Sequence, residues 1–103
     1  MLDTLHYADY APHVNTKFRL HLSPTDTVEI ELAKAEEITG HPQQERFVLS
    51  FLAPPVPPIG QGLHPLEHPQ LGAGGIFLVP VGLDATGLHL EAVFNRRREV
   101  AQA

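Results

Sequence analysis

The feature that most constrains the fold of this chain is a regular alternation of apolar and other side chains near its C-terminal end. Every second residue of the segment 88–95 is apolar: Leu88, Leu90, Ala92 and Phe94. A period of two is typical of a β-strand with one buried face, because successive side chains of a strand point to opposite sides. An apolar segment, Ile76–Val81, precedes it, and the turn-rich linker 82–87 has glycine at both ends. The pattern predicts a hairpin whose connection is longer than a two-residue turn.

Two more alternating segments predict a second hairpin nearer the N-terminus. Polar and apolar residues alternate over Lys17–Leu22 and again over Thr27–Ala33, and residues 23–26 between them have the composition of a turn. Antiparallel pairing would place the basic side chains of the first strand opposite the glutamates of the second, on a solvated face.

The middle of the chain is less regular. The segment Arg46–Ala53 is apolar on both faces, which predicts a central strand. The alternation slackens through Lys34–Glu45, so this segment is compatible with a loop or with an irregular extension of the preceding strand, and residues 40–42 (Gly-His-Pro) predict a turn.

Proline and glycine mark the segments that follow. Leu63–His68 is expected to form a short edge strand, because Pro65 and Pro69 have no amide donor. The glycine-rich residues 72–75 predict a mobile turn, and Pro80 predicts a bulge or an edge position in the strand that contains it.

The whole pattern predicts a mainly β domain. We expect five or six short antiparallel strands in a small open barrel or sandwich, with a short helix over residues 3–11 that ends at Pro12. A four-stranded α+β arrangement is the alternative. The domain boundaries that follow are 1–95 for a single β-rich domain and 96–103 for a basic C-terminal tail.

Composition excludes several classes of protein. The chain has no cysteine, so neither a disulfide framework nor a thiolate metal site can form. The formal net charge is −5, and three of the seven Lys and Arg residues lie together at 96–98, so the body of the domain is a poor surface for nucleic acid. No apolar run is long enough to insert into a membrane. We expect synthesis in the cytoplasm without a signal peptide; a final place in an extracellular or phage-like particle stays open.

The histidines do not predict a metal centre. His64 to His68 matches H-x-x-E-H, a zinc-binding spacing that requires a helix, but Pro65 makes a helix improbable. In a strand the two histidines would lie about 13 Å apart, which is too far for both to bind one ion. The other histidines have no ligand spacing, and an adventitious metal site or a solvated surface accounts for them.

No pattern predicts catalysis. Ser23 precedes a proline in a turn and Ser50 lies within a strand, so neither occupies a nucleophile elbow. The glycines at 72–75 precede a strand rather than a helix, so they lack the helix N-terminus that binds phosphate. We therefore expect no enzyme activity and no cofactor.

Two segments are candidates for interaction with other molecules. The first contains overlapping P-x-x-P spacings, typical of polyproline ligands, although no basic residue flanks it; alternatively it is a rigid spacer or a lid over the core. Its prolines are Pro54, Pro55, Pro57 and Pro58. The second is the basic run Arg96, Arg97 and Arg98, which could pair with an acidic surface on a neighbouring copy or with phosphate, or remain solvated.

Three motifs together resemble a family of short bacterial proteins of unknown function, each about one hundred residues long. The motifs are Thr4-Leu5 through Tyr10 with Pro12, Val14 and Phe18; Gln61-Gly62 with the run LEHPQLG at 66–72; and FLVPVG at 77–82 followed by Gly87 and EAVFN at 91–95. The resemblance implies an accessory or structural role, because members of this family often occur alongside phage tail-collar or tail-fibre-like proteins. The residues 63–65 depart from the family pattern, and residues 96–103 lie beyond it.

The function expected from these observations is that of a non-enzymatic structural or docking subunit. It would act through strand edges and loops in a phage-tail-like or fibre assembly, with another copy of itself or a tail-like protein as its partner. The alternative is a small-molecule or glycan-binding β-barrel module, with aromatic residues such as Tyr7, Tyr10 and Phe47 at its mouth.

Overall fold

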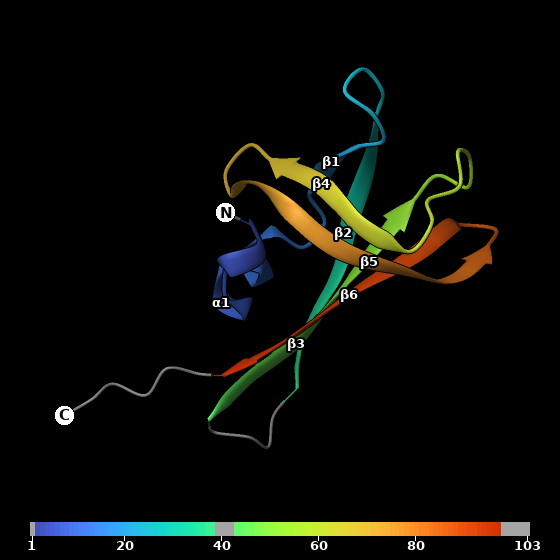
Figure 1. Ribbon diagram of the computed structural model, residues 1–103. Helices are drawn as coiled ribbons and strands as arrows, with labels where there is room; N and C mark the ends of the chain where they lie inside the picture. Colours follow the sequence, from blue (N-terminus) through green and yellow to red (C-terminus); the bar gives the residue numbers. More distant parts are fainter. Residues whose placement is uncertain (1, 39–42, 98–103) are drawn as a thin grey trace.

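The computed structural model describes residues 2–38 and 43–97, which form six strands preceded by a short helical segment (Figure 1). The N-terminal segment consists of η1 (Leu2–Thr4), α1 (Tyr7–Tyr10) and η2 (Ala11–His13). The strands are β1 (Lys17–His21), β2 (Thr27–Ile38), β3 (Gln44–Ala53), β4 (Gly62–His68), β5 (Gly72–Asp84) and β6 (Gly87–Arg97).

The six strands form one antiparallel sheet that closes into a ring in the order β1-β2-β3-β6-β5-β4. The expectation of a mainly β domain with a short N-terminal helix is confirmed. β3 lies between β2 and β6, in the central position that its apolar faces predicted. The last pair that closes the ring, β1 with β4, is short, since only Arg19↔Glu67 and Leu20↔Leu66 are partners. We call this pair the seam.

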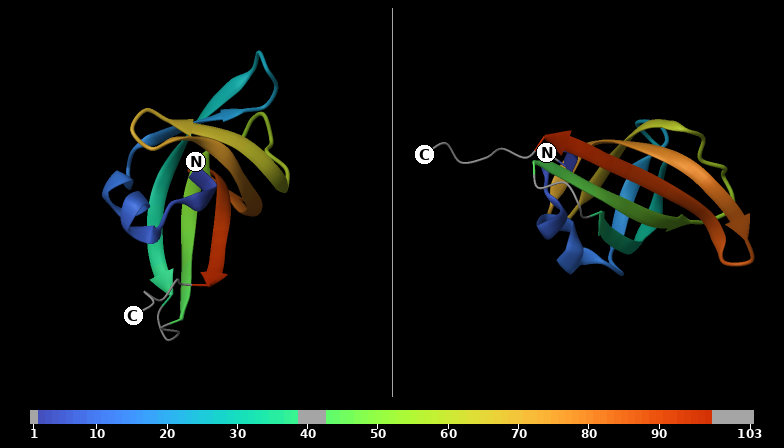
Figure 2. Two further views of the ribbon diagram at one scale, coloured as in Figure 1. Left: turned by 60° about the vertical axis from the view of Figure 1, so that its left-hand side comes forward. Right: turned by 90° about the horizontal axis from the view of Figure 1, so that it is seen from below.

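Three strands continue beyond the ring. β1 pairs with β2 only over Thr27–Glu31, and β5 pairs with β6 only as far as Glu91. Beyond those points β2, β3 and β6 pair only with one another, and Figure 2 shows them running on side by side. We call this three-stranded part the extension.

Alternate residues of the strands point into the ring and form the core. In β3 these are Phe47, Leu49, Phe51 and Ala53, all fully or almost fully buried. Phe18 packs edge-on against Phe51, with ring centroids 5.3 Å apart. Burial of these aromatic and branched side chains is the main favourable contribution to folding.

The N-terminal segment covers the inner face of the extension. Leu2 and Tyr10 are buried, and the Tyr10 hydroxyl donates a hydrogen bond to the Leu2 carbonyl. The Tyr10 ring lies 6.0 Å from Phe47 and 5.9 Å from Phe94. So short a helix is not stable alone, and it is held here by this packing. Its N-cap is His6, whose backbone amide donates a hydrogen bond to the Asp9 carboxylate.

The strands are longer than the alternation predicted. β2 runs to Ile38, with a register shift between Leu32 and Lys34. The shift changes which residues face the core, and the alternation of the sequence is therefore interrupted within a continuous strand. The predicted turn at residues 40–42 lies outside the described residues. β6 runs to Arg97, two residues beyond the expected domain boundary at Asn95, whereas residues 98–103 of the expected tail are outside the described part of the chain.

The two turns next to β5 also differ from expectation. The prediction of a turn at residues 72–75 was wrong, since these residues begin β5, where Leu63 packs over Gly75 and the N-terminal backbone of Leu2 lies against Gly74. The β5–β6 connection was expected to be long, but Asp84 and Gly87 are partners and only two residues link them. A register shift between Pro80 and Gly82 confirms the irregularity predicted at Pro80.

β4 is not an edge strand, because it pairs with β5 over its whole length and with β1 at the seam. Pro65 lies just beyond the two β4 residues that pair with β1. Pro65 is the partner of Gly75 on β5, so its missing amide does not place β4 at an edge.

Replacing Gly87 with alanine is expected to lower the free energy of unfolding by about 2–4 kcal/mol, through backbone strain and overpacking. Gly87 has φ +137, and a Cβ atom there would lie 2.4 Å from the Ala53 carbonyl oxygen. Gly82→Ala is the matched control, because a Cβ at Gly82 meets nothing within 4 Å. Urea unfolding monitored by circular dichroism measures both; equal stability of the two variants would contradict this account.

Candidate interaction surface

Exposed apolar side chains lie on the outer surface of the sheet. Leu63 on β4 and Phe77 on β5 are cross-strand partners, and their side chains are 70% and 52% exposed. Val93 on β6 is 65% exposed and pairs with Val48 on β3. Because the inner face of the same strands is packed into the core, these parts of the sheet are apolar on both faces. We call Val48, Leu63, Phe77 and Val93 the outer apolar face.

The sequence contained a signal for this surface. Leu63, Phe77 and Val93 each occupy a position out of phase with the buried residues of its strand, where a solvated strand of this kind would carry a polar side chain. The two-sided apolar character was recognised in β3 but not in β4, β5 and β6.

The predicted proline segment forms the connection between β3 and β4. Pro54, Pro55, Pro57 and Pro58 are all exposed, and Ile59, 3% exposed, anchors the end of the segment in the core. The prolines are therefore accessible on the surface. They lie in a different part of the chain from the basic run, and no contact joins the two predicted segments among the described residues.

Arg96 and Arg97 belong to β6, and Arg98 lies outside the described residues. The Arg96 guanidinium donates hydrogen bonds to the carbonyl oxygens of Asp3 and Leu5, and it lies 5.5 Å from the ring centroid of Phe94. Arg96 is therefore engaged within the chain, while Arg97 is exposed. Of the predicted basic run, Arg97 is the described residue that a partner could reach.

Glu45 is a buried, hydrogen-bonded carboxylate that the sequence patterns did not predict. Its side chain is 9% exposed, and it accepts hydrogen bonds from His6 Nδ1 at 2.7 Å and from the Tyr7 amide at 3.0 Å. Arg96 Nε lies 3.3 Å from the same carboxylate. Burial by itself would raise the pKa of Glu45, but the hydrogen bonds from His6 and Tyr7 and the charges of His6 and Arg96 outweigh it and lower the pKa.

The Glu45 cluster joins the N-terminal segment to the extension. His6 and Tyr7 begin α1, whereas Glu45 and Arg96 lie opposite the N-terminal segment on neighbouring strands of the extension. The signal for it in the sequence was a glutamate at a core-facing position, two residues before Phe47. Without the tertiary structure this signal could not be distinguished from the start of a solvated strand.

His64 and His68 do not form a pair. His64 Nε2 lies 2.7 Å from the Gly60 carbonyl oxygen, whereas His68 is 5% exposed at the end of β4. The Nδ1 atom of His68 accepts from the backbone amides of Gln70 and Leu71, at 3.1 and 3.3 Å. His68 therefore fixes the turn between β4 and β5. In the described part of the chain no group of three or more potential ligand side chains is placed to hold a metal ion.

His68 also contacts the segment that precedes β1. Its Nε2 atom is 2.9 Å from Thr16 Oγ1, and that hydroxyl donates to the His13 carbonyl at 2.6 Å. The rings of His13 and Phe18 lie 4.9 and 4.6 Å from the His68 ring. Burial, and then the neighbouring His13, lower the pKa of His68.

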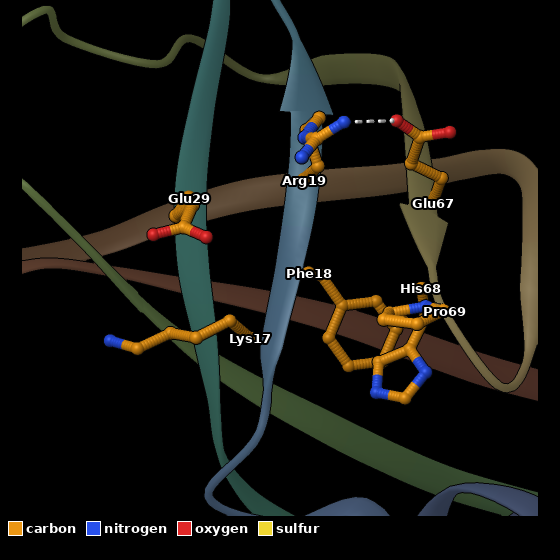
Figure 3. Close-up of a pocket in the computed structure, with 7 residues that line it drawn as sticks. All are labelled: Lys17, Phe18, Arg19, Glu29, Glu67, His68 and Pro69. Carbon is orange, nitrogen blue, oxygen red and sulfur yellow. Dashed lines mark hydrogen bonds and ion pairs between the residues drawn. The ribbon is translucent and has the colours of Figure 1, made fainter.

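A pocket of about 360 Å³ opens beside the seam (Figure 3). Phe18, His68 and Pro69 line it together with charged side chains, and the dashed contact in Figure 3 is the 3.3 Å ion pair between Arg19 and Glu67. A larger pocket of about 900 Å³ lies beside α1 and includes His6, Glu45 and Arg97 in its lining.

The tip of the β5–β6 hairpin carries a hydrogen-bonded cluster of exposed polar residues. Asp84 accepts from the amide and hydroxyl of Thr86, and His89 Nε2 lies 3.0 Å from the second Asp84 oxygen. The Thr86 hydroxyl and amide, followed by His89, lower the pKa of Asp84 to about 2. The cluster is exposed, and its internal bonds account for the two-residue turn.

Among the described residues no helix is long and apolar enough to span a membrane. A family model described as a domain of unknown function, DUF6916, matches residues 5–94. Neither a curated protein nor a solved structure matches this chain.

Proposed function

This chain belongs to the DUF6916 family of domains of unknown function, and we propose that it is a non-enzymatic structural or docking subunit of a larger assembly. The observation that supports this proposal is the outer apolar face. Phe77 is 52% exposed, and its cross-strand partner Leu63 is 70% exposed. Apolar surface that folding leaves in water favours association, because its removal from water is favourable.

The partner that we propose for this face is a second copy of the chain. A sheet that is packed on one side and apolar on the other forms a two-layer sandwich when a similar sheet covers it. The alternative partner for this face is a different subunit of the assembly.

Strand edges contribute less than the sequence suggested. Closure of the ring pairs the central residues of β1 and β4 with each other, and the longest edges outside the ring are those of the extension. There Lys34, Glu36 and Arg97 carry charges, and charged side chains on an edge oppose further strand pairing. We therefore assign docking to the outer apolar face.

The larger assembly that we propose is phage-tail-like or a fibre. A phage-tail-like or fibre assembly is supported by the resemblance of the motifs LEHPQLG, FLVPVG and EAVFN to proteins found alongside tail-collar and tail-fibre-like proteins. Electron microscopy of the purified protein would show rings or fibres if self-association alone builds such an assembly.

Replacing Phe77 with serine is expected to weaken self-association by about tenfold or more, the effect of losing one central apolar contact of an interface. Light scattering over a micromolar concentration series measures the change for Phe77→Ser and for Val93→Ser. Val56→Ser is the matched control, because Val56 is 75% exposed but lies in the proline loop. A wild-type chain that remains monomeric throughout the series would contradict self-association. Binding to a different subunit that Phe77→Ser abolishes would identify the alternative partner.

Small-molecule binding remains the second candidate, and the pocket beside the seam supports it. Its volume of about 360 Å³ lies within the range of ligand sites. The aromatic mouth expected for this function is not open, since Tyr10 and Phe47 are both buried in the core. Titration with small carbohydrates and carboxylates, followed by NMR shifts of Phe18 and His68, tests this candidate separately from self-association.

A further inference from the structure

The seam depends on a histidine whose hydrogen bonds require the neutral form. The Nδ1 atom of His68 accepts from two backbone amides, so it cannot carry a proton itself. The hydroxyl of Thr16 uses its proton to donate to the His13 carbonyl, so it accepts from Nε2–H of His68. These bonds assign His68 as the neutral tautomer with its proton on Nε2.

We propose that the seam is an acid-sensitive closure: protonation of His68 releases the turn after β4 and opens the ring between β1 and β4. A proton on Nδ1 would point at the amides of Gln70 and Leu71, so both bonds of the turn would be lost. Opening exposes the edges of β1 and β4, which the closed ring hides. This inference does not rest on the proposed docking function.

The seam is the part of the ring where such a change has the greatest effect. Only two residue pairs join β1 and β4, whereas β3 and β6, on the opposite side of the ring, are partners at ten positions from Gln44↔Arg97 to Ala53↔Leu88. The Phe18 ring packs on His68 directly beside these two pairs. With so short a seam, the packing of Phe18 on His68 is one of the few contacts that hold β1 beside β4, and it depends on the position of the His68 ring.

Charged and titratable groups lie on both the inner and the outer side of the seam near His68. His13 faces its ring from η2, and protonation of both histidines would place two like charges beside each other. On the outer face Glu67 pairs with Arg19 at 3.3 Å and with His21 at 3.0 Å. Lys17 and Glu29 line the same pocket, with Lys17 3.6 Å from Glu31. Opening is therefore expected to begin on the inner side, at Phe18 and His68.

The sign of the pH dependence follows from the buried position. Burial and His13 lower the pKa of His68, so the folded chain binds this proton less tightly than the unfolded chain does. The stabilising contribution of His68 is therefore complete above its ordinary pKa of 6.5 and decreases as the pH falls below that value. Above 6.5 the contribution does not change with pH.

The experiment is amide hydrogen exchange by NMR on the full chain, between about pH 7.5 and about pH 5, with exchange corrected for its intrinsic pH dependence. Protection of the Gln70 and Leu71 amides is expected to fall by up to about tenfold for each pH unit below the ordinary pKa of histidine. Amides of β3 and β6 should retain their protection. The ¹⁵N shifts of the His68 ring report its tautomer in the same sample.

His68→Asn separates this device from general acid sensitivity, because the asparagine side-chain oxygen occupies the place of Nδ1 and cannot be protonated in this range. The variant should keep the turn and lose the pH dependence of the Gln70 and Leu71 amides. His64→Asn is the matched control on the same strand and should keep the wild-type dependence. Unchanged protection of Gln70 and Leu71 in the wild type, equal loss at β3 and β6, or a pH dependence that persists in His68→Asn would each overturn the proposal.

Discussion

Replacing Phe47 with alanine is expected to lower the free energy of unfolding by about 3–5 kcal/mol, the cost of removing a buried aromatic side chain and leaving a cavity. Phe47 is fully buried and stacks on Phe94, with ring centroids 4.5 Å apart and planes 8° from parallel. It also contacts Tyr7 and Tyr10, so together with Phe94 it forms the aromatic surface on which the N-terminal segment packs.

Chemical denaturation with a two-state fit measures this loss. Val48→Ala is the matched control, because Val48 is the next residue of β3 and points to the opposite face; its cost should be below about 1 kcal/mol. In the Phe47→Ala variant, hydrogen exchange should show the N-terminal segment and the extension opening before the rest of the ring. Similar costs at the two positions would contradict the assignment of Phe47 to the core.

Replacing Glu45 with alanine is expected to cost about 2–4 kcal/mol, because the change removes a buried carboxylate and leaves its partners unpaired. His6 and the Tyr7 amide lose their acceptor, and Arg96, whose side chain is 28% exposed, loses its counter-charge. The loss is below that of a fully buried ion pair because Arg96 keeps its bonds to main-chain carbonyls and some contact with water.

The Glu45 contribution also has a defined pH window. Its pKa is lower in the folded chain than its ordinary value of 4.5, so the contribution is complete above that value and is lost as the pH falls below it. This window lies below the one expected for His68. Denaturation at a series of pH values should therefore show a smaller loss on acidification below about pH 5 in Glu45→Ala than in the wild type.

Glu31→Ala is the control for Glu45, since Glu31 pairs with Lys17 at 3.6 Å on the solvated face of the first hairpin. An exposed pair of this kind contributes at most about 1 kcal/mol. If Glu45→Ala costs no more than Glu31→Ala, the Glu45 cluster does not hold the N-terminal segment in place.

The alternation of side chains identified the positions of the strands because a period of two depends only on which side of the local backbone each residue faces. The first hairpin illustrates this, since its alternating residues pair with the predicted charges opposite each other, as in Lys17↔Glu31 and Arg19↔Glu29. The strand ends were less accurate. The register shift at Leu32 changes the phase of β2, and a pattern that assumes constant phase then reads as a loop.

The candidate site was harder to predict. The basic run was expected to pair with a neighbouring copy or with phosphate, or to remain solvated, yet Arg96 contacts Asp3 and Leu5, more than ninety positions earlier in the chain. Exposure of Phe77 and Val93 depends on which elements cover the outside of the ring, and the described chain places none over these two residues.

A mainly β chain, with strands at the alternating segments and a short helical segment before them, could be predicted from the amino acids alone, because side-chain period and turn composition are properties of neighbouring residues. Three features could be found only in the folded chain: closure of the sheet at a two-pair seam, the contacts of Glu45 and Arg96 with the N-terminal segment, and the buried position of His68. Burial, and the free energy of an ion pair or of a buried imidazole, depends on groups brought together from distant parts of the chain.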